Sequence, residues 1–314
     1  MVFYQLLIII FGFVLIAKSA NEIIKSLIRV AGYLGFTEFA ISFLLVGVIS
    51  VMPELVIGVM SAVEGTPSFG LGIIFGSNIA DLTLIIGTVA LLSKSIKLHS
   101  STIKQAKFLV LLIALPVLLL WDSELSRLDG LILLLAFLFY IYRVVKLHGP
   151  SVQPFIKKKP DIFFEFTVLL VCLIVVFISG NMITHAGKEL SSILFLPLFF
   201  VGIILAVGTC IPELAMAVQA SRKKHAELGF GDIIGNVFAD CTGTIGIIAL
   251  ISPIRPEYPQ LTVLTGIIMV GSLMALLFIF GSNKKISKRE GVYLILMYIL
   301  LLMFQFIVEK MTVV

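Results

Sequence analysis

The sequence predicts an all-α membrane protein with about ten transmembrane helices, arranged as two inverted five-helix repeats. The first observation is composition: 60% of the 314 residues are hydrophobic and only 13% are charged, and the mean hydropathy is +1.16, which is outside the range of soluble domains. The second is a series of apolar runs of about 20 residues, each long enough as a helix to cross a hydrocarbon layer of about 30 Å. The third is a gap-free internal repeat.

Each expected helix is an apolar segment bounded by charged, glycine or proline residues. In chain order the expected helices cover residues 2–30, 37–64, 69–91, 103–121, 127–147, 161–187, 195–221, 229–251, 258–281 and 288–309. The connection after the fifth differs from the others, because it carries several prolines and three consecutive lysines. We therefore divide the chain into a first repeat at 1–147, a cytoplasmic linker at 148–160 and a second repeat at 161–314.

The orientation of the repeats follows from helix number and charge. Five helices per repeat is an odd number, so the second repeat enters the membrane from the side opposite to the first, an arrangement that places transporter sites near the bilayer midplane. Lys and Arg collect on the cytoplasmic side of membranes. With the N-terminus outside, most of the 23 Lys and Arg residues fall in cytoplasmic connections. We expect a multi-pass protein of the cell membrane with both termini extracellular.

This topology also accounts for the net charge of +5. The basic residues are dispersed over many short connections, so we expect no nucleic-acid binding. The lipid bilayer is the expected partner of the apolar surface, and the sequence gives no sign of an obligatory protein partner. Cys172, Cys210 and Cys241 lie in apolar segments without metal-ligand spacing, so we interpret them as small apolar side chains and expect no cofactor.

The internal repeat relates a segment of the first half to a segment of the second. Ser50-Val51-Met52-Pro53-Glu54-Leu55 matches Thr209-Cys210-Ile211-Pro212-Glu213-Leu214, and Gly76-Ser77-Asn78-Ile79-Ala80-Asp81 matches Gly235-Asn236-Val237-Phe238-Ala239-Asp240. One offset of 159 serves both motifs, since 213 − 54 and 240 − 81 give the same number. We call the motif regions 47–81 and 206–240.

Four carboxylates lie within these copies, far from any connection: Glu54, Asp81, Glu213 and Asp240. An ionisable side chain at mid-bilayer costs about 2.5–3.5 kcal/mol on insertion scales, so these acids must face one another or water rather than lipid. No Lys or Arg occupies a matching position inside the membrane. The four acids therefore predict a negatively charged centre that binds a cation.

Further oxygen atoms share the faces of these acids. A hydroxyl or amide residue precedes each acid by one helical turn, in the pairs Ser50 with Glu54, Ser77 with Asp81, Thr209 with Glu213 and Asn236 with Asp240. Pro53 and Pro212 lack an N–H and crowd the carbonyl four residues earlier, so each should break its helix and leave backbone carbonyls free. Such an all-oxygen environment suits a hard cation such as Ca²⁺ or Na⁺.

Three classes of function fit a cation site inside a membrane. An intramembrane enzyme would need two acids around a scissile bond or aspartate-rich runs that bind Mg²⁺-diphosphate, and the sequence has no such run and no basic cluster within the membrane to hold phosphates. A passive cation channel would need a continuous acidic pore, and it stays open as an alternative. We expect a secondary antiporter and no enzymatic activity.

The same motifs resemble those of the cation/calcium exchanger superfamily, in its small prokaryotic members of the sodium/calcium exchanger type. The resemblance is clearest in Gly208-Thr209-Cys210-Ile211-Pro212-Glu213 and in Gly76-Ser77-Asn78-Ile79-Ala80-Asp81, and it extends over essentially the whole chain. It implies an antiporter that exchanges Ca²⁺ for a monovalent cation by alternating access, in which the helices at 2–30 and 161–187 slide over the remaining core.

The resemblance also implies roles for individual residues. Glu54 and Glu213 would bridge the calcium ion with oxygens from Ser50 and Thr209, and Asp81 and Asp240 would complete the centre. Flanking monovalent-ion sites would use Ser77 and Asn236 with the carbonyls of Gly47 and Ala206.

Several positions depart from the pattern of sodium-coupled members. Val51 and Cys210 stand where those members have a serine hydroxyl, and Asp81 stands where they have asparagine. Fewer hydroxyls weaken sodium sites, whereas a fourth carboxylate can bind a proton, because clustered like charges favour the neutral form. Sodium is the expected counter-ion, and protons or a dependence on potassium are the alternatives.

Overall fold

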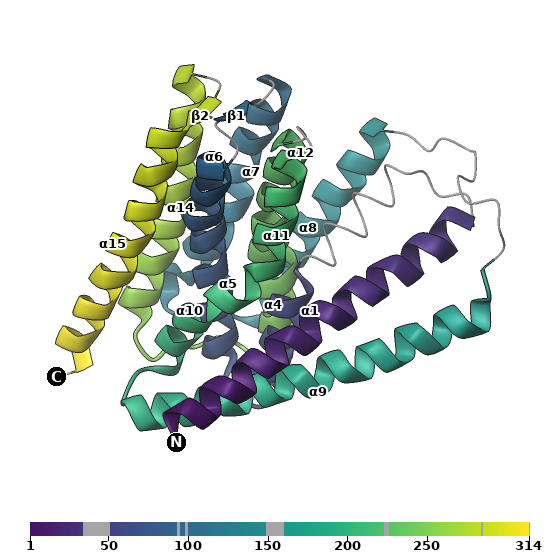
Figure 1. Ribbon diagram of the computed structural model, residues 1–314. Helices are drawn as coiled ribbons and strands as arrows, with labels where there is room; N and C mark the ends of the chain where they lie inside the picture. The colour runs from purple at the N-terminus through teal and green to yellow at the C-terminus, as the bar shows by residue number, and fades with distance from the viewer. Residues whose placement is uncertain are drawn as a thin grey trace.

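The computed structural model of this chain describes residues 1–33, 51–92, 95–97, 100–148, 160–222, 226–283 and 285–313, and these are mostly helical (Figure 1). Within these ranges, seven helical segments are long and apolar enough to cross a membrane. The chain is therefore a multi-pass helical membrane protein. The count of ten helices stays a prediction, because residues 34–50, in the second expected helix, and residues 149–159 of the expected linker lie outside the described ranges.

The first half begins with one long helix and continues as shorter helical pieces. Its elements are α1 (Val2–Tyr33), α4 (Met52–Val63), α5 (Pro67–Ala80), the π-helix η2 (Asp81–Ile85), α6 (Ile86–Leu92), the strand β1 (Ser95–Lys97), α7 (Ser100–Leu119), the 3₁₀-helix η3 (Leu120–Asp122) and α8 (Arg127–His148). The segment expected as one helix at 69–91 is continuous, but it passes through a π-helical turn at Asp81.

The second half repeats this order. Its elements are α9 (Ile162–Leu194), α10 (Leu198–Thr209), α11 (Ile211–Arg222), α12 (Ala226–Ala239), the π-helix η4 (Asp240–Thr244), α13 (Ile245–Ile251), α14 (Pro259–Asn283), the strand β2 (Lys285–Ser287) and α15 (Lys288–Val313). β1 and β2 pair antiparallel, with Ile96 opposite Ile286. The segment expected at 195–221 is broken, as its proline predicts, between α10 and α11.

The repeat in the sequence is also a repeat of helix boundaries. α11, α12, η4 and α13 begin and end 159 residues after α4, α5, η2 and α6, as 211 − 52 and 251 − 92 show. The contacts are reciprocal: α6 packs on α15 as α13 packs on α8, and the equivalent pairs α1 with α9 and α7 with α14 pack on each other. Such an exchange of partners is what an approximate two-fold relation between the halves produces.

Glycines allow the closest of these contacts. A Cβ atom on Gly87 would lie 2.7 Å from the carbonyl oxygen of Gly291, and one on Gly130 would lie 2.8 Å from that of Gly246. The two crossings are equivalent, because Gly246 follows Gly87 by 159 residues and Gly291 follows Gly130 by 161. Backbone therefore touches backbone where α15 crosses α6 and where α8 crosses α13, and any side chain at these positions would separate the halves.

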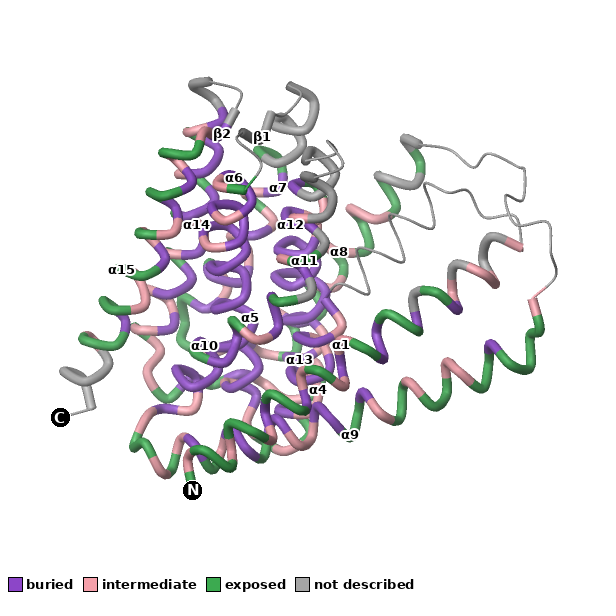
Figure 2. Tube along the Cα trace, in the orientation of Figure 1, coloured by how far each residue is buried: buried purple, intermediate pink, exposed green. Residues whose placement is uncertain are grey.

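The helices α1 and α9 lie side by side along one side of the bundle and extend beyond it (Figure 1). Figure 2 shows exposed residues along both of them, whereas the bundle interior is buried. The two helices are joined by a bidentate ion pair, in which Arg29 Nε and Nη2 lie 2.5 and 2.8 Å from the Glu165 carboxylate, and by the Ser26 hydroxyl, which donates to the Glu165 carbonyl at 3.2 Å. They therefore form a pair of their own along one side of the bundle.

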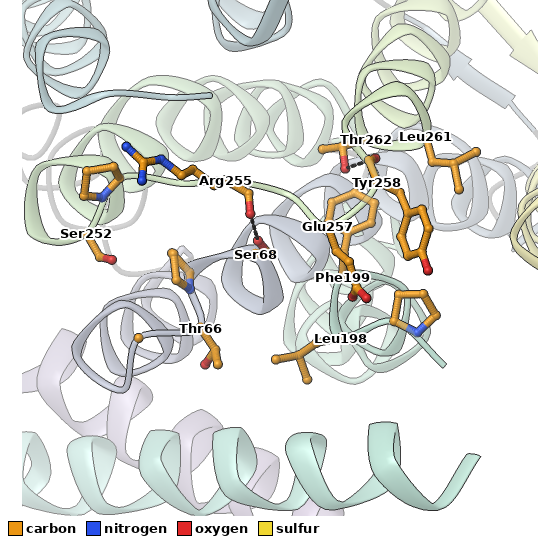
Figure 3. Close-up of a pocket in the computed structure, with 14 residues that line it drawn as sticks. Thr66, Ser68, Leu198, Phe199, Ser252, Arg255, Glu257, Tyr258, Leu261 and Thr262 are labelled. Carbon is orange, nitrogen blue, oxygen red and sulfur yellow. Dashed lines mark hydrogen bonds between the residues drawn. The ribbon is translucent and has the colours of Figure 1, made fainter. Parts of the chain in front are cut away.

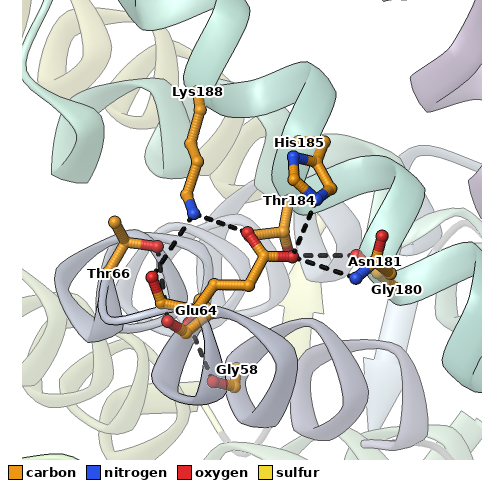
Figure 4. Close-up of polar contacts among 9 residues, drawn as sticks. Gly58, Glu64, Thr66, Gly180, Asn181, Thr184, His185 and Lys188 are labelled. Atoms are coloured by element: carbon orange, nitrogen blue, oxygen red, sulfur yellow. Dashed lines mark hydrogen bonds and ion pairs between the residues drawn. The ribbon is translucent and has the colours of Figure 1, made fainter.

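A cluster around Glu64 ties this pair to the bundle (Figure 4). Glu64 follows α4 and is approached by three side chains of α9: Lys188 Nζ at 2.5 Å, Asn181 Nδ2 at 3.1 Å and His185 Nε2 at 3.5 Å. Arg29 is the equivalent of Lys188 in the first half, because it lies 159 residues earlier. Its ion pair is with Glu165 of α9. The Glu64 cluster thus anchors α9 to the turn between α4 and α5 at one end of the helix pair.

We predict that Lys188→Met lowers the thermal midpoint of the protein in detergent. The Glu64 carboxylate is only 12% exposed and would lose its principal cation, which corresponds to about 1–3 kcal/mol for a partly buried charged group. The matched control is Lys25→Met, because the Lys25–Glu22 pair is 49% exposed on both sides and should contribute at most about 1 kcal/mol. Equal midpoints for the two variants would contradict the anchoring role.

Candidate functional site

Glu54 and Glu213 occupy equivalent places at the start of two short helices. Glu54 lies in the first turn of α4 and Glu213 in the first turn of α11, and each residue is 4% exposed. The partial positive charge of a helix N-terminus stabilises an acidic side chain in this position. The predicted break before Glu213 is confirmed, because α10 ends at Thr209 and α11 begins at Ile211. Pro53 lies in the first turn of α4, while the residues before Val51 are outside the described ranges.

Asp81 and Asp240 each open a π-helical turn, 159 residues apart. The N–H of Ile86 donates to the carbonyl of Asp81, and the N–H of Ile245 donates to that of Asp240. The hydroxyls of Thr83 and Thr242 bond back to carbonyls four residues earlier, at 2.5 and 2.7 Å. A π-turn inserts an extra residue into the helical repeat and is frequent at functional sites. The sequence motifs do not reveal these turns.

The close crossing of α5 and α10 brings one acid of the first half next to the helix break of the second. A Cβ on Gly76 would lie 2.8 Å from both the Ile203 Cα and the Ala206 Cβ. One turn further, the Cys210 thiol lies 3.6 Å from the carbonyl oxygen of Ser77. The residues around Asp81 therefore border the turn at Cys210 that separates α10 from α11.

The four predicted acids form one buried electrostatic cluster. Like-charge repulsion links Glu54 with Asp81, Glu213 and Asp240, and none of the four residues is more than 4% exposed. Each carboxylate has one oxygen atom that is buried and has no hydrogen-bond donor: Glu54 Oε2, Asp81 Oδ1, Glu213 Oε2 and Asp240 Oδ1. Four partly unsatisfied acids in one place create a strong demand for positive charge.

No cation of the protein meets that demand among the described residues. The ion pairs found there involve other acids, such as Glu64, Glu124 and Glu165. In the same part of the chain, no group of three acidic, histidine or cysteine side chains is close enough to hold a metal ion by itself. A bound cation would therefore need neutral oxygens as well as carboxylates in its coordination shell.

Neutral oxygens are present beside the acids. The hydroxyl of Thr209 donates to the Ala206 carbonyl at 2.8 Å and that of Ser77 donates to the Ile74 carbonyl at 3.1 Å, so both hydroxyl oxygens keep lone pairs for a cation. Asn236 is 2% exposed, and both polar atoms of its side chain are without a partner. The predicted ligands Ser50 and Gly47 lie outside the described residues.

One polar residue beside the cluster was not assigned a role from the sequence. The amide nitrogen of Asn78 donates to Cys241 Sγ at 3.4 Å and to Met269 Sδ at 3.6 Å, which leaves its buried oxygen without a partner. The residue stands inside the Gly76-Ser77-Asn78 motif, but its partners come from η4 and α14. Only the folded chain reveals that its oxygen is free.

A cavity of about 310 Å³ lies elsewhere, where α5, α10 and α14 begin (Figure 3). Its lining includes Ser68, Arg255, Glu257 and Tyr258 but none of the four clustered acids. The Ser68 hydroxyl donates to the Arg255 carbonyl at 3.3 Å. The cavity and the acidic cluster are therefore separate features of the molecule.

The fold and the buried acids define a multi-pass membrane protein with an acidic centre built from two matching halves. The family model described as sodium/calcium exchanger protein matches residues 4–146 and 164–307. This chain belongs to that family of antiporters.

Individual relatives resemble the chain over most of its length. It is 27% identical to the putative antiporter CaxA of Alkalimonas amylolytica, over 93% of this chain and 95% of the relative. It is also 27% identical to the sodium/calcium exchanger MaX1 of Methanosarcina acetivorans, over 98% and 99% of the two chains. A solved structure of the sodium-calcium exchanger NCX_Mj, soaked with Na⁺ and Sr²⁺, superposes with a TM-score of 0.66 at 21% identity and covers 96% of this chain and 98% of that one, a similarity of fold.

We predict that Gly76→Ala disturbs the acidic cluster from the helix crossing. The added methyl group would meet the Ile203 carbonyl oxygen at 2.9 Å, so α10 would have to move away from α5, at about 1–3 kcal/mol of stability. The thermal midpoint in detergent should fall. Gly271→Ala is the control, because a Cβ there meets nothing within 4 Å; an equal loss in that variant would refute the explanation.

Proposed function

We propose that this protein is a secondary antiporter that exchanges Ca²⁺ for a monovalent cation, with Na⁺ as the expected counter-ion. The observation that supports this most directly is the cluster of four buried acids, each with an oxygen atom that has no partner. Membership of the sodium/calcium exchanger family supports the same reading. The cations are transported substrates, which compete for one site.

Calcium would lie between Glu54 and Glu213, which occupy the first turns of equivalent helices. Two carboxylates balance its charge, and Thr209 and Ser50 would supply neutral oxygens, since Ca²⁺ takes six to eight oxygen ligands. Asp81 and Asp240 would complete the centre. The monovalent sites would use Ser77 and Asn236 with the carbonyls of Gly47 and Ala206.

Transport would proceed by alternating access between two inverted five-helix repeats, with the acids near the midplane. The matched helix boundaries and reciprocal contacts of the two halves support this arrangement. The moving part would be the pair α1 and α9, because both helices carry many exposed residues and have their own ion pair. In this topology both termini are extracellular, and the Glu64 cluster lies on the extracellular side.

The chemistry of the cluster also supports a second candidate for the counter-ion. Val51 and Cys210 bring no hydroxyl to the site, while Asp81 adds a carboxylate that can accept a proton. Exchange for protons is therefore the second candidate. A passive cation channel would instead conduct Ca²⁺ without any counter-ion.

We predict that Glu54→Gln or Glu213→Gln, each on its own, reduces counter-ion-driven calcium uptake into proteoliposomes by about a hundredfold or more, because each change removes a charge from the calcium shell. Glu22→Gln is the control, since Glu22 is exposed and pairs only with Lys25 on its own helix. Full uptake by both single variants would reject the assignment. If calcium uptake by the unaltered protein does not depend on any counter-ion, this would support a channel.

We predict that an outward Na⁺ gradient at clamped pH drives calcium uptake by the unaltered protein, whereas a pH gradient without Na⁺ drives little. Both gradients are imposed on the same proteoliposome preparation, and Glu54→Gln protein provides the background. Uptake that follows the pH gradient alone would assign the exchange to protons and remove sodium from the mechanism.

A further inference from the structure

Tyr298 carries a buried hydroxyl group that the transport scheme above does not use. The residue lies in α15 and is 5% exposed, and its hydroxyl has no hydrogen-bond partner. Buried polar groups in native proteins are almost always paired, so an unpaired one indicates a missing ligand or a bound water. Four of the other unpaired side chains belong to the clustered acids.

The packing of α15 brings the helix of Tyr298 next to the part of the chain that carries Asp81. This helix packs on η2, the π-turn that Asp81 opens, and on α6. Each of these two packed elements carries a buried oxygen without a partner, Oδ1 of Asp81 in η2 and the hydroxyl of Tyr298 in α15. A cation with a preference for oxygen could be bound by both of these atoms.

The equivalent position in the first half differs in a single chemical respect. The glycine crossings relate Gly291 to Gly130, and the same offset of 161 relates Tyr298 to Phe137. A Cβ on Gly243 would lie 3.3 Å from the Phe137 ring, and this ring stacks on Phe238. The repeat thus relates Tyr298, on the helix that packs on η2, to a phenylalanine whose ring contacts η4, and of the two only Tyr298 carries a hydroxyl.

We propose that the Tyr298 hydroxyl is an oxygen ligand of a monovalent metal cation bound next to Asp81. One carboxylate and a neutral hydroxyl match a single positive charge, and the placement of the hydroxyl on one side makes the two flanks of the cluster unequal. Calcium, between the two matched glutamates, does not require it. This inference rests on the proposed exchange of Ca²⁺ for a monovalent cation.

The test is Tyr298→Phe, which removes only the hydroxyl and keeps the aromatic ring. We expect the Na⁺ concentration for half-maximal calcium exchange in proteoliposomes to rise about three- to tenfold. Calcium–calcium exchange without Na⁺ should keep its apparent calcium affinity within about twofold. Tyr140→Phe is the matched control, because Tyr140 is a partly buried tyrosine of α8 that packs on Phe238.

A binding measurement makes the test independent of transport. Na⁺ should raise the thermal midpoint of the unaltered protein, and this rise should be reduced in Tyr298→Phe, while the rise produced by Ca²⁺ is kept. Unchanged Na⁺ dependence in both measurements would overturn the role of Tyr298 and leave the antiporter intact, as would an equal loss of calcium affinity, which would indicate a structural role. Calcium exchange by the unaltered protein without any response to Na⁺ would overturn both this inference and sodium coupling.

Discussion

Four carboxylates buried in the helical bundle, with no cationic side chain paired to them in the described part of the chain, are the constraint on which the rest of this structure depends. Each acid retains an oxygen without a donor, and repulsion between the acids adds to their desolvation. The fold partly compensates for this by placing Glu54 and Glu213 at helix N-termini, where the backbone carries partial positive charge. The remaining demand is for a mobile cation, so the feature that makes the protein unstable in isolation is also the one that makes it bind ions.

The two-fold pattern of helices follows from the same constraint. A divalent ion held between equivalent glutamates needs both halves to present the same oxygen atoms at the same depth. The identical spacing of the short helices and π-turns achieves this, and the glycine contacts at Gly87 and Gly130 keep the halves in register. The long helices α1 and α9 lie outside this frame and are held to it at Glu64. In the proposed mechanism, binding and movement would belong to different parts of the molecule.

The sequence predicts most of this architecture because its strongest signals are local. Hydropathy defines the segments, the offset of 159 relates the halves, and Pro212 predicts the break that separates α10 from α11. The π-turns at Asp81 and Asp240 were not predicted, because an extra residue in a helical turn leaves no composition signal in a uniformly apolar segment. Asn78 and Tyr298 were missed for a different reason: their significance is an absent hydrogen bond, which depends on helices distant in sequence. The ligand set and the inverted orientation stay predictions.

An exact repeat would present the same ligands, and so bind the same ion, on both flanks of the acidic cluster. An antiporter has to bind two different ions, so a departure from exact repetition is useful to it. Tyr298, with its unpaired hydroxyl, lies on α15, which packs on the η2 turn, whereas Asn236 and Asp240 belong to the side where Phe137 stacks on Phe238. The two flanks therefore offer different oxygen atoms around carboxylates of equal charge. A difference in neutral ligands changes the affinity for a weakly charged ion more than that for a divalent one, because carboxylate charge dominates the binding of the latter. In the proposed function, inequality between the flanks would thus tune the counter-ion while the proposed calcium site between the glutamates stays the same.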